Sequence, residues 1–97
     1  MLADLSLPPG LELVRTTREF SAEDTPAGLR SAHRVATGVW GLLRVREGTV
    51  TFVLEHPGGG DGERREVAAG HRQVIEPDVV HHVEPGAGAR FVVEFHR

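Results

Sequence analysis

The chain has 97 residues, of which 39% are hydrophobic and 26% are charged, and this is the composition of one globular domain. Its net charge of -3 argues against nucleic-acid binding, because phosphate recognition needs a concentrated basic surface. The absence of cysteine excludes disulfides and thiolate metal sites. Because no apolar run could span a bilayer and Asp4 stands where a signal peptide would be basic, we expect a cytoplasmic protein with no membrane partner.

The chain order predicts a short leader followed by an all-β domain. Residues 1–10, which end in Pro8-Pro9-Gly10, are expected to be a disordered or loosely attached leader, and residues 11–97 form the domain. Eight short strands are predicted, with one helical turn over 21–28. The strands cover residues 11–20, 29–35, 39–45, 49–54, 63–69, 73–76, 80–84 and 90–96. Short strands without crossover helices indicate an antiparallel sandwich or barrel.

Two blocks of sequence carry a family resemblance. The first runs through Pro-Ala-Gly-Leu at 26–29, His33, Thr-Gly-Val-Trp-Gly-Leu-Leu at 37–43 and Glu-Gly-Thr-Val-Thr-Phe at 47–52. The second is Ile-Glu-Pro-Asp-Val-Val-His-His-Val-Glu-Pro at 75–85, followed by Phe-Val-Val-Glu-Phe at 91–95. Together they resemble the small cupins related to the N-terminal domain of the tellurite-resistance protein TehB and to the stand-alone protein YeaR. The resemblance covers residues 20–96.

The resemblance implies a single-domain antiparallel double-stranded β-helix, that is, a cupin jelly-roll barrel. It also implies a homodimer and a central pocket that often holds a divalent metal. It supplies no reaction. The methyltransferase domain that follows the cupin in TehB has no counterpart in these 97 residues, so methyl transfer is not carried over.

The expected metal site departs from the family pattern. A metal-binding cupin usually has two histidines and a glutamate in its first motif and one histidine in its second. Here the first block offers only His33, and Gly41 stands at the place of the glutamate. His81 follows Pro77 at the spacing that points it inward. A site with three protein ligands therefore needs one more donor.

Glu94 is the predicted third ligand, because the last strand of a cupin runs beside the strand that normally supplies the glutamate. The alternation of Phe91, Val93 and Phe95 favours the opposite placement, with Glu94 on the outside of the sheet. The sequence leaves both placements open. For His33 and His81, the alternative to metal ligation is a buried imidazole that bonds to the backbone.

Three further residues are candidates for ligand binding. Glu76 lies next to the turn that leads to His81, although an ion pair with an arginine explains it as well. Trp40 could form a pocket wall or anchor the core. Arg44, if it points inward, would bind an anion such as a carboxylate or an oxyanion.

The leading hypothesis is a small-molecule-binding protein in which His33, His81 and Glu94 hold zinc, iron or nickel. Such a metal could polarise a substrate oxygen or activate water or dioxygen, so whether the protein is an enzyme stays open. The alternative is a metal-free ligand-binding or stress-response module without catalysis. A weaker third hypothesis is an interaction partner of a separate enzyme.

Overall fold

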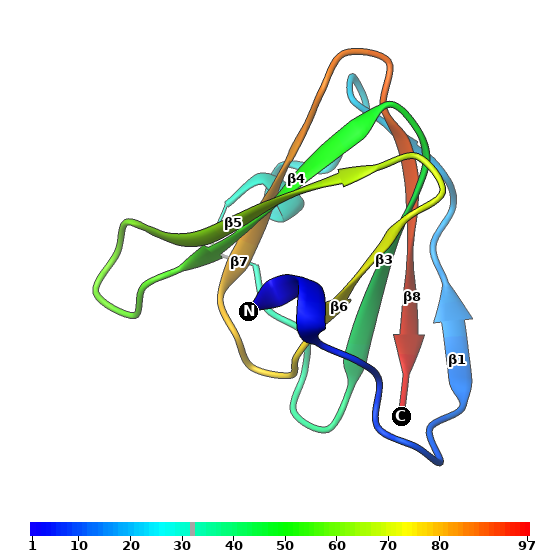
Figure 1. The fold of residues 1–97 in the computed structure, drawn as a ribbon, viewed down its shortest axis with the longest axis vertical. Helices are drawn as coiled ribbons and strands as arrows, with labels where there is room; N and C mark the ends of the chain where they lie inside the picture. Colours follow the sequence, from blue (N-terminus) through cyan, green and yellow to red (C-terminus); the bar gives the residue numbers. More distant parts are fainter. Residues whose placement is uncertain (32) are drawn as a thin grey trace.

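The computed structural model describes residues 1–31 and 33–97 and consists of two antiparallel sheets (Figure 1). One sheet has the order β1-β8-β3-β6, with the short β2 also pairing with β8, and the other has the order β5-β4-β7. The elements are η1 (Leu2–Asp4), β1 (Leu13–Thr16), β2 (Phe20–Ser21), η2 (Ala27–Arg30), β3 (Trp40–Glu47), β4 (Thr49–Glu55), β5 (Asp61–Ala68), β6 (Arg72–Ile75), β7 (His81–Pro85) and β8 (Arg90–His96).

The core lies between the two sheets and follows from period-two alternation along the strands. On β8, Phe91 and Val93 face inward, and on β3, Leu43 and Val45 do the same. The three-stranded sheet contributes the apolar side chains of β4, β5 and β7, of which Phe52 is 1% exposed. This alternation places one set of apolar side chains between the sheets, while Leu42 and Val92 on the opposite faces of β3 and β8 are buried as well.

The two sheets do not close into a barrel, so the predicted cupin jelly-roll barrel is wrong. The strands pair only within their own sheet among the described residues, and the edges β5 and β6 share no ladder. Side chains bridge this seam instead: Arg65 of β5 donates to the carbonyl of Arg72 (3.0 Å) and to Oε1 of Gln73 (2.7 Å). The prediction of an antiparallel all-β domain is confirmed.

The leader closes the same seam and is not loosely attached, contrary to the prediction. Leu2 is 3% exposed and belongs to the core cluster. Its N–H donates to Glu63 Oε2 (2.9 Å), and its carbonyl accepts from Nε2 of the buried Gln73 (2.9 Å). An apolar side chain and two backbone hydrogen bonds thus fix η1 over the gap between β5 and β6.

One predicted strand is replaced by other structure. Within 29–35 the structure shows the end of η2 and, at His33, a single bridge to His81, while residue 32 lies outside the described residues. The predicted extended segment 11–20 divides into β1 and β2. None of the helices in the described part of the chain has the length and hydropathy needed to cross a membrane.

Candidate functional site

A cavity of about 320 Å³ lies between the sheets, under the segment 21–30. Its walls are the inward-facing apolar side chains of β3, β6, β7 and β8, together with Pro26 and Leu29 of the covering segment. Three polar residues line it: Arg15, His33 and His81. A mostly apolar cleft with a few convergent polar groups is the usual form of a small-molecule site.

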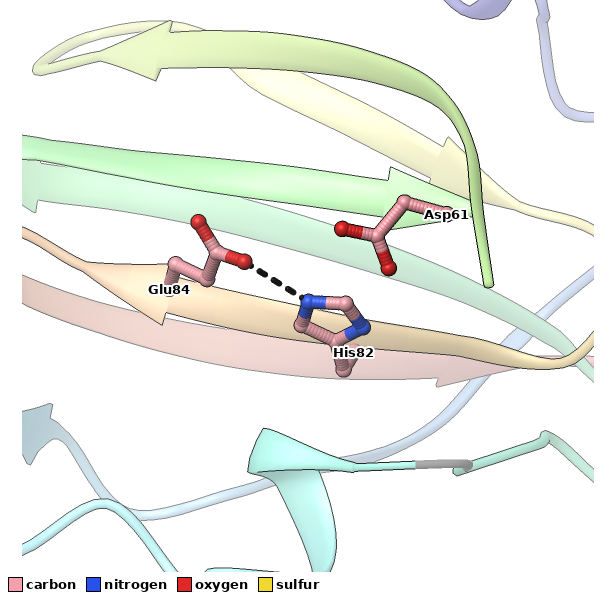
Figure 2. Close-up of side chains that lie close together, drawn as sticks. All are labelled: Asp61, His82 and Glu84. Atoms are coloured by element: carbon pink, nitrogen blue, oxygen red, sulfur yellow. Dashed lines mark hydrogen bonds and ion pairs between the residues drawn. The ribbon is translucent and has the colours of Figure 1, made fainter. Parts of the chain in front are cut away.

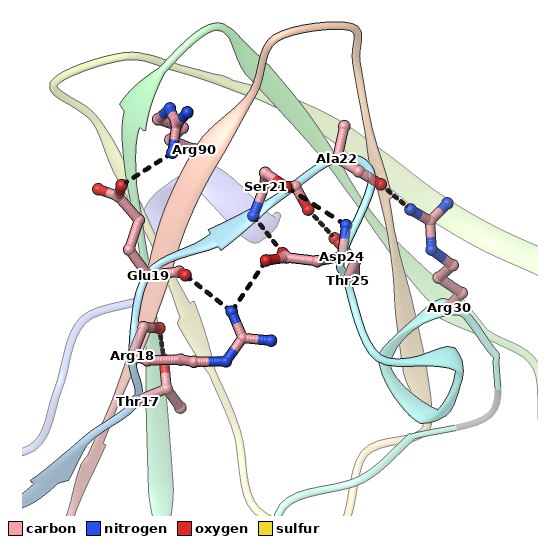
Figure 3. Close-up of polar contacts among 9 residues, drawn as sticks. All are labelled: Thr17, Arg18, Glu19, Ser21, Ala22, Asp24, Thr25, Arg30 and Arg90. Atoms are coloured by element: carbon pink, nitrogen blue, oxygen red, sulfur yellow. Dashed lines mark hydrogen bonds and ion pairs between the residues drawn. The ribbon is translucent and has the colours of Figure 1, made fainter.

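Polar contacts hold the covering segment in place (Figure 3). Asp24 accepts from the backbone N–H of Ser21 (2.6 Å) and from Nη1 of Arg18 (3.0 Å). Thr25, which is buried, donates from its hydroxyl to the Ser21 carbonyl (2.6 Å), and Arg30 donates to the Ala22 carbonyl. These local bonds fold 21–25 into a compact turn and position η2 against β7.

The backbone brings the two predicted histidine ligands together. His33 and His81 exchange both of their backbone hydrogen bonds, each at 2.8 Å. Their rings lie edge to face with centroids 5.3 Å apart. His81 also stacks on Phe52, with centroids 5.0 Å apart. The inward orientation expected for His81 is therefore present, and His33 lines the same cavity.

His81 is held neutral by its surroundings. Only 2% of the residue is exposed, and this burial lowers its pKa to about 4, although the nearby Val79 carbonyl favours the charged form. Its Nδ1 lies 3.1 Å from the Val79 carbonyl oxygen. Because a carbonyl can only accept, the proton of the neutral ring must be on Nδ1, and Nε2 keeps its lone pair.

His33 has an unsatisfied polar atom. Its Nδ1 is buried and has no hydrogen-bond partner among the described residues, and burial lowers the pKa of the ring. A buried polar atom without a partner is costly, so it indicates a place where a ligand, a water molecule or an ion can bind. The neutral imidazoles of His33 and His81 are the donors that could hold a divalent metal.

The third predicted ligand lies elsewhere. Glu94 is on the outer face of β8, where its Oε2 accepts from Nε of Arg44 (2.6 Å) and its Oε1 lies 3.0 Å from Nε2 of His96. Burial alone would raise the pKa of Glu94, but the bonds to His96 and Arg44 outweigh burial and lower it. The apolar alternation of β8 thus decides the open question, and Glu94 does not meet the two histidines.

The position of the usual cupin glutamate is also crowded. A Cβ on Gly41 would lie 3.1 Å from Cβ and 3.2 Å from Cδ1 of Ile75, which is tighter than ordinary contact. The donor set at the cavity is therefore two histidines, one short of the three protein ligands that a catalytic zinc site normally has.

The other predicted ligand-binding residues are outside the cavity. Trp40 and Arg44 project from the outer face of β3, where Trp40 is half-buried opposite His96. Glu76 is exposed just beyond the end of β6. None of the three is among the residues that line the cavity in the described part of the chain.

A cluster of charged groups that sequence reasoning missed lies on the outer face of the three-stranded sheet (Figure 2). Ligand atoms of Asp61, His82 and Glu84 lie within 4.8 Å of one another. His82 is 9% exposed, with Nδ1 2.8 Å from Glu55 and Nε2 2.8 Å from Glu84. The signal was available, because residues 82 and 84 share one face of a strand.

Arg64 forms ion pairs with two carboxylates of this cluster. It contacts Asp61 at 3.1 Å and Glu84 at 2.6 Å. Burial lowers the pKa of His82, but the hydrogen bonds to Glu84 and Glu55 outweigh this and raise it. We interpret the cluster as an ion-pair network on the sheet surface.

Fold and site together define a small β domain of two sheets with a cavity between them. The model of the TehB-like domain matches residues 15–93, and the chain belongs to the TehB-like family. The part that matches contains β2 to β7 and all of the residues that line the cavity except Phe95.

Solved structures show the same fold. The chain is similar to a protein from E. coli strain K12, with a TM-score of 0.86, 24% identity and 96% of each chain covered. It is also similar to TehB from Haemophilus influenzae, with a TM-score of 0.83 and 20% identity over 89% of this chain and 31% of the TehB chain. Comparison with curated proteins gives no match. The relationship to TehB expected from the sequence is confirmed, whereas the likeness to YeaR stays a prediction.

Proposed function

We propose that the protein binds a small molecule with an apolar body and one carboxylate in the cavity between the sheets. The observation that carries this proposal is the cavity lining, which is apolar except for Arg15, His33 and His81. Its volume of about 320 Å³ suits a ligand of modest size. The proposal needs no catalytic step.

The polar groups indicate how such a ligand would be oriented. The guanidinium of Arg15 lies 5.7 Å from the centroid of the Phe95 ring, so it is held at the cavity by a cation–π contact. A guanidinium is a strong carboxylate partner. The bare Nε2 of His81 can accept a hydrogen bond from a ligand hydroxyl, and the apolar walls take the body of the ligand.

The proposal is tested by adding benzoate or hexanoate to the protein in the presence of a chelator. Binding is detected by a rise in the unfolding temperature and by changes in the NMR signals of the cavity residues. Arg15→Gln should weaken binding about tenfold, the worth of one charge-assisted hydrogen bond. Arg90→Gln, an exposed arginine that pairs with Glu19 and Glu47, is the matched control and should bind like the parent. Binding that leaves the cavity resonances unchanged, or that Arg15→Gln does not weaken, would refute the proposal.

A second candidate function is divalent metal binding at His33 and His81. It is supported by the unsatisfied Nδ1 of His33 and the lone pair of His81, while the missing third ligand counts against it. A zinc, iron or nickel ion held there would supply Lewis acidity to a bound ligand. Metal analysis of protein purified without a histidine tag decides the matter. The metal site would be established if the parent protein holds stoichiometric metal, His81→Ala loses it and the exposed control His71→Ala keeps it. A metal content unaffected by His81→Ala would refute the site.

A further inference from the structure

A second hollow, of about 670 Å³, lies outside the five-stranded sheet between the leader and the strands β3 and β6. The leader forms one wall with Leu2, Leu5 and Leu7, and Leu42 and Val74 form the apolar floor. The charged residues that line it, among the described residues, are the three arginines Arg44, Arg65 and Arg72, and no carboxylate is among them. We call this hollow the arginine groove. The cavity between the sheets lies on the other face of β3.

Strand pairing forces two of these arginines together. Arg44 of β3 and Arg72 of β6 are Cα partners in the ladder, so their side chains leave the same face of the sheet side by side. Like charges placed directly opposite each other destabilise a sheet. The third, Arg65, reaches the groove from β5 and is fixed by its bonds to the Arg72 carbonyl and to Gln73.

The carboxylates that pair with the three arginines of the groove carry less charge than the three guanidiniums. Arg44 pairs with Glu94, but that carboxylate also bonds His96. The guanidinium of Arg72 has no hydrogen-bond or ion-pair partner in the part of the chain that the structure describes. Although the whole chain is acidic, with a net charge of -3, three guanidiniums thus line one groove, and no carboxylate is among the described residues that line it.

We propose that the arginine groove binds a phosphoryl group, either as inorganic phosphate or as a phosphomonoester. Paired guanidiniums present two parallel N–H donors each, a geometry that matches tetrahedral oxyanions. An anion between Arg44 and Arg72 converts the repulsion of this cross-strand pair into attraction. The apolar floor and the leader lie where the organic part of a phosphomonoester would rest.

Calorimetric titration with inorganic phosphate and with phenyl phosphate tests the proposal, at ionic strength kept constant with sodium chloride. We expect binding that moves the NMR signals of Gly70 and His71, which line the groove. Arg72→Gln should weaken it about tenfold, and the exposed position of Arg72 means that the variant should fold normally. Tighter binding of phenyl phosphate identifies a phosphomonoester as the ligand, and equal or weaker binding identifies free phosphate.

Arg46→Gln is the matched control. It removes the same charge from the same strand, two residues from Arg44, but at a side chain that pairs with Glu19 away from the groove. Its affinity should equal that of the parent. The proposal is overturned if phosphate has no more effect than sodium chloride, or if Arg72→Gln and Arg46→Gln lose affinity equally. The result does not depend on carboxylate binding in the cavity, where a separate arginine, Arg15, is tested.

Discussion

His81 combines almost complete burial with a titratable ring, and this combination makes stability depend on pH. The unfolded chain takes up a proton at His81 near pH 6.5, whereas the folded chain does so only near pH 4. Stability is therefore lost as the pH falls between these values, because the unfolded state binds more protons. His33, whose pKa is also lowered, acts in the same direction. His82 has a raised pKa, so its contribution grows as the pH falls through 6.5 and opposes part of the loss that His81 causes.

We predict that the free energy of unfolding falls by about 2 kcal/mol between pH 7 and pH 5 on account of His81. This range lies above the ordinary pKa of the carboxyl groups, so their protonation contributes little. His81→Gln should remove most of this loss, while His71→Gln, at an exposed histidine, should retain it. Urea unfolding of chelator-treated protein at both pH values measures the effect. An equal pH dependence in His81→Gln and the parent would contradict the assignment.

At single positions, the sequence predicted some orientations and missed others. The inward placement of His81 was predicted from its motif, whereas Glu94 was predicted as a metal ligand although the apolar row of β8 favoured the outer face, where it lies. The pairing of Glu94 with Arg44 could not be predicted, because it depends on β3 and β8 lying in register across 50 residues of sequence. The same holds for the arginine groove, which residues from three strands and the leader form.

Among the elements, the β3–β4 hairpin depends on close packing at Gly48. This residue has φ of +69°, and a Cβ there would lie 2.9 Å from Cα of Ala89, a backbone atom that cannot move aside cheaply. Gly88 has a similar φ of +74° but open space around it. Both glycines avoid the strain of a left-handed conformation, and only Gly48 also allows this close approach.

We predict that Gly48→Ala lowers the free energy of unfolding by at least about 1 kcal/mol more than Gly88→Ala does. Each variant incurs the cost of a side chain at positive φ, so the difference isolates the contact with Ala89. Chemical denaturation of both variants and the parent measures it. Equal losses would show that the loop of Ala89 relaxes away from the new methyl group.

The strands from β3 onward follow the sequence prediction closely, because β-branched runs and glycine turns mark them. The N-terminal third does not. The segment 29–35 has the composition of a strand, but Pro26 and Gly28 favour the tight turn of η2, and in the described part of this segment His33 alone pairs with β7. The leader was expected to be loose because Pro8, Pro9 and Gly10 break regular structure. Its attachment depends on Leu2 filling a gap that only the folded sheets create.

For the whole molecule, the resemblance supplied the correct family and the wrong architecture. Whether two sheets join into a barrel depends on the separation of their edge strands, which no local pattern encodes. Here the edge strands β5 and β6 form no backbone ladder, so the sheets stay separate. The side chains of Gln73 and Arg65 link the two edges, and the leader covers the gap between them. The arginine groove lies at this same seam, since Arg65 and Arg72 come from its two sides.

The other edge of the five-stranded sheet indicates how the chain associates. Every residue of β1 is exposed, with Leu13 at 55% and Val14 at 53%, and β1 pairs with β8 on one side only among the described residues. An exposed apolar edge strand favours pairing with another chain. A domain of 97 residues buries a limited share of its own surface, so association with a second copy would add to its stability. We therefore predict a homodimer in which the β1 strands of two copies pair.

Sedimentation equilibrium should give twice the chain mass of 10.5 kDa for the parent protein. Val14→Lys places a charge in the predicted interface and should shift the protein to the monomer, because a lysine on an edge strand opposes strand pairing. Ala87→Lys adds the same charge in an exposed turn and should leave the dimer intact. A parent protein that stays at 10.5 kDa at high concentration would exclude this association, and a dimer unaffected by Val14→Lys would exclude β1 as its interface.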